Sequence, residues 1–148
     1  MKKYAEYVSF EELIQKSDII TLHVPGNDEN THLIDETAFK KMKDGVIIVN
    51  TARGLIIDTQ ALIASLKNGK VGFAALDTFE GEVGLYYLNK ETQRLDNDNM
   101  ALLKSFPNVI LSPHMAFYTE QAVSDMVENS IKGILGLESG EDNRLAVK

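Results

Sequence analysis

The chain has 148 residues, the size of one domain with at most a small appendage. Its residues are 44% hydrophobic and 25% charged, as in ordinary globular proteins, and the lack of cysteine excludes disulfides, thiolate metal sites and a cysteine nucleophile. The formal net charge of −7 argues against a nucleic-acid partner or an acidic membrane surface. Because the sequence has no long apolar run and no secretory leader, we expect no membrane partner and a cytoplasmic location.

Four short apolar runs, rich in β-branched residues, predict strands near residues 18–24, 46–50, 71–77 and 108–112. The runs are continuously apolar, which is typical of strands buried on both faces of a parallel sheet. Helical signals lie around and between them, over residues 10–16, 37–42, 59–67, 99–105 and 120–137. Ser9, Asp58 and Thr119 are suited to cap three of these helices. This alternation indicates the α/β class with a doubly wound, Rossmann-like parallel sheet of about four strands.

The last predicted helix carries an apolar stripe at helical spacing. The stripe consists of Val123, Met126, Val127, Ile131, Ile134 and Leu135.

Ligands bind such sheets at the carboxyl ends of the strands, so the residues that follow each strand are functional candidates. Arg53 follows the second run, and its guanidinium can hold a carboxylate through two hydrogen bonds. Asp77 closes the third run, Glu82 follows it, and His114 follows the fourth. Taken singly, each residue is more often structural. Together, a cation, a carboxylate and an imidazole suit proton transfer at a carbonyl group that adjoins a carboxylate.

Other kinds of site lack their motifs in this sequence. It has no HExxH, no serine or cysteine nucleophile arrangement, and no GxGxxG among its ten glycines. We therefore predict no metal site.

Four segments resemble the C-terminal half of the D-isomer-specific 2-hydroxyacid dehydrogenases, an NAD-dependent family, and they occur in the same order and at the same spacing. These segments are residues 23–25, 42–54, 75–82 and 112–119, and the likeness covers nearly the whole chain. Phe117-Tyr118 and Glu82-Val83-Gly84 resemble the D-lactate branch, which includes bacterial D-lactate dehydrogenase and the vancomycin-resistance type.

The resemblance implies a role for each matching residue. It implies that Arg53 binds the substrate carboxylate, that His114 is the acid/base, and that Glu82 pairs with and tunes this histidine. NAD is the implied cofactor, with contacts to Val24, Pro25, Asn30, Thr51, Ala52, Arg53 and Asp77, the last at the nicotinamide carboxamide. Substrate binding is implied for Arg53, His114, Phe117 and Tyr118. The implied substrate is a small 2-keto or 2-hydroxy acid, with pyruvate and D-lactate favoured.

The resemblance also implies a domain organisation. Residues 1–117 correspond to the C-terminal part of an NAD-binding domain without its GxGxxG unit. Residues 118–148 correspond to a return helix and a tail of a substrate domain that is mostly absent. Members of the family commonly dimerise through the nucleotide-binding domain, so a homodimer is expected.

Two other functions stay open. Without GxGxxG, the 148-residue polypeptide by itself is expected to bind NADH poorly and to be inactive, which fits a non-catalytic fragment or a dimerisation module. A corepressor of the same fold, acting as a nucleotide-dependent scaffold, is the third hypothesis. The D-lactate-like pair Phe117-Tyr118 argues mildly against the corepressor.

Overall fold

The computed structural model describes residues 4–87, 89, 92 and 97–140. The chain forms two compact units, Met1–His114 and Met115–Lys148. The predicted boundary between residues 117 and 118 stays a prediction, and the part of the predicted tail over residues 141–148 lies outside the described residues.

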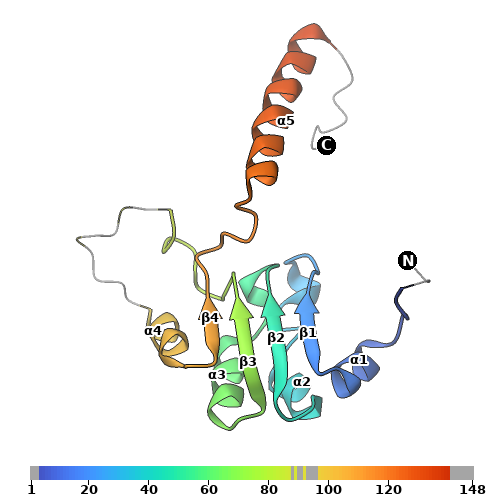
Figure 1. Ribbon diagram of the computed structural model, residues 1–148, viewed down its shortest axis with the longest axis vertical. Coiled ribbons are helices and arrows are strands. Elements are labelled where there is room, and N and C mark those ends of the chain that lie inside the picture. The colour runs from blue at the N-terminus through green and yellow to red at the C-terminus, as the bar shows by residue number, and fades with distance from the viewer. Residues whose placement is uncertain (1–3, 88, 90–91, 93–96, 141–148) are drawn as a thin grey trace. The chain divides into compact units, whose positions relative to one another are not determined.

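The first unit is built on a four-stranded parallel sheet in the order β1-β2-β3-β4 (Figure 1). The strands are β1 (Ile19–Leu22), β2 (Val46–Asn50), β3 (Val71–Leu76) and β4 (Val109–Leu111). Every neighbouring pair is parallel, which confirms the predicted topology. β1, β3 and β4 are shorter than the apolar runs. The first run ends near Pro25, which lacks the N–H that a strand ladder needs.

The helices of this unit lie where the sequence predicts them, within one residue at each end. They are α1 (Phe10–Lys16), α2 (Glu36–Lys41), α3 (Thr59–Lys67) and α4 (Asp98–Ser105), with two 3₁₀ turns, η1 (Asp28–Asn30) and η2 (Gly54–Ile56). Each α-helix begins behind a side chain that accepts a backbone N–H of the first turn, from Ser9, Asp35, Asp58 and Asn97 respectively.

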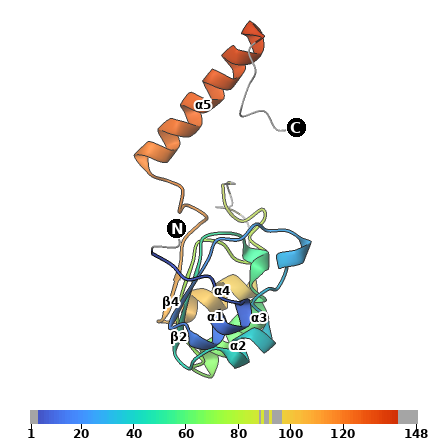
Figure 2. The same ribbon diagram turned by 90° about the vertical axis from the view of Figure 1, so that its right-hand side faces the viewer.

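The four helices lie on one side of the sheet, as Figure 2 shows. The core between the two layers includes Ile34, Phe39, Ile48, Leu62 and Val71, none more than 2% exposed. Burial alternates along β1 and β2, so the other face of the sheet is only partly buried. This differs from the expected burial on both faces, because within the described residues no helix of this unit covers the second face.

The second unit contains α5 (Glu120–Ser139), which begins behind Thr119 and ends at Gly140 in the left-handed conformation. The predicted helix is confirmed and extends two residues further than expected. Most of its predicted apolar stripe is exposed, including Met126, Ile131 and Leu135. No helix in the described part of the chain has both the length and the apolar character needed to cross a membrane.

Candidate active site

The imidazole of His114 and the carboxylate of Glu82 lie together where β3 and β4 end. His114 Nδ1 is 2.8 Å from Glu82 Oε1, and the two side chains are 33% and 13% exposed. The other carboxylate oxygen, Oε2, accepts the backbone N–H of Phe79 at 3.2 Å. With Glu82 ionised, Nδ1 carries the proton that it donates. The opposite nitrogen, Nε2, is then the ring atom suited to exchange a proton with a ligand.

The backbone at His114 holds the ring in a fixed place. His114 has a φ of 55°, one of three positive φ values at non-glycine residues in the described part of the chain. This left-handed conformation costs roughly 1–2 kcal/mol for a residue with a side chain. Hydrogen bonds oppose the cost: the N–H of His114 donates to the carbonyls of Asp77 and Ser112, and the Tyr87 hydroxyl donates to the carbonyl of His114. Tyr87 itself has a φ of 62°.

Asp77 directly follows β3 and is 5% exposed. Its Oδ1 accepts the hydroxyl of Ser112 at 2.5 Å, and its N–H donates to the carbonyl of Asn50 at 2.9 Å. These bonds join the ends of β2, β3 and β4. The implied contact of Asp77 with nicotinamide stays a prediction.

Acidic side chains at this rim affect the pKa of Tyr86. Burial, together with the negative charges of Glu82 and Asp77, raises the pKa of the Tyr86 hydroxyl. Its ring packs edge-to-face on Phe79, with centroids 6.3 Å apart. Tyr86 therefore keeps its proton and serves here as a packing residue.

Arg53 stands after β2, beside a cleft of about 540 Å³. The cleft is lined by His23, Val24, Pro25, Gly26, Thr51, Ala52 and Arg53. The buried Asn50 shapes the turn, since its side chain bonds the backbone of both Ala52 and Arg53 at 3.0 Å. Arg53 is exposed, and its Nη1 donates to the Ala52 carbonyl at 2.7 Å. It makes no ion pair with any described residue, so its remaining N–H groups are suited to an anionic ligand.

These residues suit one part of a dinucleotide. The cleft lies at the carboxyl ends of β1 and β2, where sheets of this kind bind nucleotides, and its volume is typical of ligand pockets. At Gly26 a Cβ would come within 2.6 Å of Arg53 Cγ, so only glycine lets this loop lie against the arginine stem. Asn30 is not among the lining residues, but its side chain donates to the Pro25 carbonyl at 2.9 Å. The sequence has no GxGxxG loop for the diphosphate.

Phe117 and Tyr118 belong to the second unit. Their rings pack edge-to-face on each other, with centroids 6.0 Å apart, and both are exposed. Their implied contact with substrate stays a prediction.

Sequence reasoning missed a second histidine–glutamate pair. His32 Nε2 is 2.8 Å from Glu80 Oε1, and each side chain is 41% exposed. The hydrogen bond to Glu80 raises the pKa of His32, helped by the negative charges of Glu80, Asp58 and Asp35 and opposed by burial. Forty-eight positions separate the partners, so no local pattern connects them.

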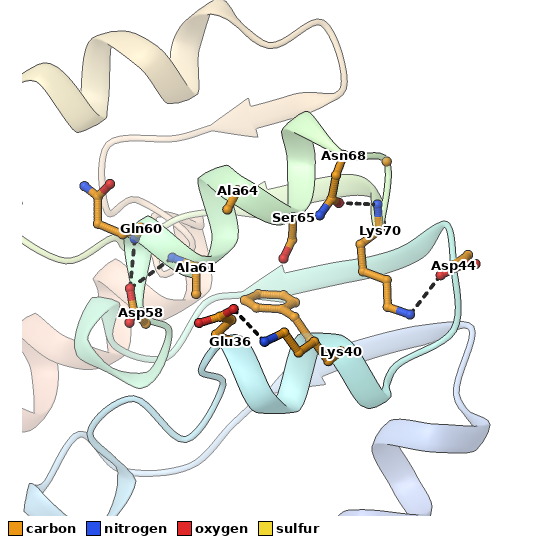
Figure 3. Close-up of a pocket in the computed structure, with 12 residues that line it drawn as sticks. Glu36, Lys40, Asp44, Asp58, Gln60, Ala61, Ala64, Ser65, Asn68 and Lys70 are labelled. Carbon is orange, nitrogen blue, oxygen red and sulfur yellow. Dashed lines mark hydrogen bonds and ion pairs between the residues drawn. The ribbon is translucent and has the colours of Figure 1, made fainter.

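A larger hollow, of about 880 Å³, lies between α2 and α3 (Figure 3). Both lysines that line it are already paired, Lys40 with Glu36 at 2.7 Å and Lys70 with Asp44 at 2.8 Å. None of the predicted site residues lines this hollow. We therefore place the candidate active site at the strand ends and not in this larger hollow.

Comparison with known proteins places these residues in a family context. Residues 1–116 match the family described as "D-isomer specific 2-hydroxyacid dehydrogenase, NAD binding domain". An aromatic 2-oxoacid reductase of Clostridium sporogenes is 49% identical over 137 residues, which are 93% of this chain and 41% of that protein. A D-specific alpha-keto acid dehydrogenase of Enterococcus faecium is 44% identical, over 93% of this chain and 42% of that protein.

Among solved structures, a D-lactate dehydrogenase from Treponema pallidum superposes with a TM-score of 0.94 at 40% identity. The match covers 99% of this chain and 44% of that chain. The chain thus spans about two fifths of the length of the curated relatives it matches.

Proposed function

The chain belongs to the D-isomer-specific 2-hydroxyacid dehydrogenases, and from this premise we propose that the full-length protein containing it transfers a hydride between NAD(H) and a small 2-keto or 2-hydroxy acid. The observation that carries this proposal is the contact of His114 with Glu82, which leaves one imidazole nitrogen for proton exchange. It lies at the same strand-end rim as the cleft beside Arg53. NAD is the cofactor of the family.

Each residue performs one part of the reduction. The chemistry that NADH supplies when bound is a hydride for the keto carbon. His114 gives the proton on Nε2 to the keto oxygen, so that the 2-keto acid becomes a 2-hydroxy acid. Glu82 holds the ring through Nδ1 and stabilises the imidazolium form. Arg53 binds the substrate carboxylate and orients the carbonyl, because a guanidinium offers two parallel N–H groups.

The cleft beside Arg53 supports a proposal for where this chain contacts NAD. We assign Val24, Pro25, Thr51 and Ala52 to its wall, with Asn30 supporting Pro25 and Asp77 meeting the nicotinamide end. Phe117 and Tyr118 are assigned to substrate contact. By itself, the 148-residue chain is expected to bind NADH weakly, because it has no glycine-rich loop for the diphosphate. A micromolar dissociation constant measured by NADH fluorescence would contradict this expectation.

Two candidate substrates differ in the side chain of the 2-keto acid. The D-lactate-like segments favour pyruvate and D-lactate. An aromatic 2-oxo acid is the second candidate, because the relative from Clostridium sporogenes carries that substrate class in its name. Comparison of kcat/KM for pyruvate and phenylpyruvate on the full-length protein separates the two. The proposed reaction fails if NADH binds but neither acid is reduced, and the corepressor hypothesis then gains.

Self-association is also proposed. The second face of the sheet exposes apolar side chains, with Ile19 60% and Ile110 58% exposed, and the stripe on α5 is exposed too. Large exposed apolar patches are usually covered by a partner. Light scattering of the 148-residue chain should therefore give a mass above the 16.5 kDa of one copy. A uniform monomer at high concentration would count against the homodimer.

A further inference from the structure

Glu80 and Glu82 project to two different histidines from one loop. Gly81 stands between them with a φ of 83°, a conformation that favours glycine. Glu82 pairs with His114, and Glu80 pairs with His32, which comes from the loop after β1. The proposed reaction uses only the first pair.

The second pair joins three rim loops. The backbone N–H of His32 donates to the carbonyl of Leu55 in η2 at 2.8 Å, and its side chain reaches Glu80 after β3. The other oxygen of Glu80 accepts the backbone N–H of Thr59, at the start of α3, at 3.5 Å. His32 and Glu80 therefore tie the loop after β1 and the loop after β3 to the segment that directly follows the Arg53 turn, at η2 and at the start of α3.

That turn packs directly on the loop of Glu80. Arg53 is followed by Gly54, where a Cβ would lie 2.1 Å from the carbonyl carbon of Phe79 and 2.5 Å from the N of Glu80. The two backbones are thus in close contact. Any shift of Glu80 moves the support of the Arg53 turn, and it also moves Glu82, two residues further along the same loop.

The backbone at His32 shows that its position is imposed by its surroundings. Its φ is 52°, a value that costs free energy and persists only where neighbouring contacts enforce it. The charged groups acting on its imidazole are all acidic, namely Glu80, Asp58 and Asp35. The protonated imidazole is therefore the form that this environment stabilises.

We propose that His32 and Glu80 are a positioning pair that fixes the spacing between Arg53 and the His114–Glu82 pair. This inference rests on the proposed function, because the spacing matters only for a substrate that both sites hold at once. A 2-keto acid has its carboxylate and its reacting carbonyl on adjacent carbons. The cation and the proton donor must therefore be held at one separation.

The test uses the full-length protein and the variants His32→Asn and Glu80→Ala, singly and together. Asn tolerates positive φ, so His32→Asn removes the imidazole and leaves the backbone conformation accessible. Glu29→Gln is the matched control, since Glu29 is an exposed acid on the same loop after β1. The measurements are kcat and KM for the keto acid, the dissociation constant of NADH, and the pKa of His32 followed by NMR on histidine-labelled protein.

We expect each single variant to raise KM and lower kcat, with kcat/KM falling by about 10- to 100-fold, the range that misplacement by about 1 Å produces. NADH affinity should stay close to wild type. The double variant should lose no more than the worse single variant, because the two residues act as one unit. The control should behave as wild type.

The outcomes distinguish this inference from the function on which it rests. Keto-acid reduction with normal kcat and KM in both single variants would overturn the positioning pair and leave the proposed function intact. Losses that simply add in the double variant, or a His32 pKa that Glu80→Ala does not lower, would also overturn it. A wild-type protein that binds NADH but reduces no keto acid would overturn the proposed function, and this inference with it.

Discussion

The two histidine–glutamate pairs differ in burial and in the nitrogen they engage, although their geometry is alike. Both have a contact of 2.8 Å, and both histidines have positive φ. Glu82 is 13% exposed and Glu80 is 41% exposed. Glu82 engages Nδ1 of His114, whereas Glu80 engages Nε2 of His32. A carboxylate contact alone therefore does not define an acid/base. Two features distinguish the proposed acid/base His114 from the proposed positioning residue His32. They are the imidazole nitrogen that stays free for a ligand and the exposure of the pair to solvent.

The largest expected difference between the pairs is in turnover. In the full-length protein, His114→Gln should lower kcat by ~10²–10⁴-fold, the usual contribution of a positioned proton donor. NADH affinity should be nearly unchanged, since the imidazole acts on the substrate. Steady-state kinetics and an NADH fluorescence titration measure the two effects. A smaller loss in His114→Gln than in His32→Asn would reverse the roles given to the two pairs.

Arg53 is the residue whose placement the His32–Glu80 pair is proposed to control. Arg53→Lys should raise KM and lower kcat, for a combined loss of ~10–100-fold, because an ammonium cannot reproduce two parallel N–H groups and a hydrogen bond to a charged group is worth ~1.5–3 kcal/mol. Keto-acid kinetics measure the loss. Unchanged KM would mean that the substrate carboxylate binds elsewhere.

The same substitution at both glutamates compares the pairs directly. Glu82→Gln should lower kcat about tenfold, because the amide still accepts a hydrogen bond but no longer stabilises the imidazolium. Glu80→Gln should lower it less, since the amide can keep the contact with His32. Parallel kinetics at one pH give the ratio. Equal losses would remove the distinction between the two carboxylates.

The smallest effect concerns stability. Glu80 raises the pKa of His32, so its stabilisation is fully present below the ordinary histidine value of about 6.5 and is lost as pH rises through the raised pKa of the folded state. Glu80→Gln should therefore lower the free energy of unfolding at acidic pH, by less than ~1 kcal/mol for so exposed a pair, and have no effect at high pH. Urea unfolding followed by circular dichroism at several pH values tests this, and the opposite pH trend would contradict it.

Much of the fold was predictable because its signals are local. Apolar runs located the strands, and Ser9, Asp58 and Thr119 capped helices as predicted. The one-sided covering of the sheet was not predictable, because an apolar run does not show which layers are present to bury it.

The residues of the candidate site also fall into a predictable and an unpredictable group. His114 and Glu82 follow strands, so topology alone brings them to one rim. His32 and Tyr87 stand in irregular loops with positive φ, and long-range contacts fix their positions. No repeating pattern in the sequence indicates such long-range contacts.

Gly54 has a consequence for mutational tolerance. The three atoms nearest to its missing Cβ are all backbone atoms, of Phe79 and Glu80, so no side-chain rotation can move them away to make room for a methyl group. A residue larger than glycine there must push the loop after β3 away from the turn after β2. Since that loop holds both Glu80 and Glu82, one added carbon at position 54 would disturb the partners of both histidines together. Position 54 therefore admits a single amino acid for reasons of space, and the whole rim depends on it.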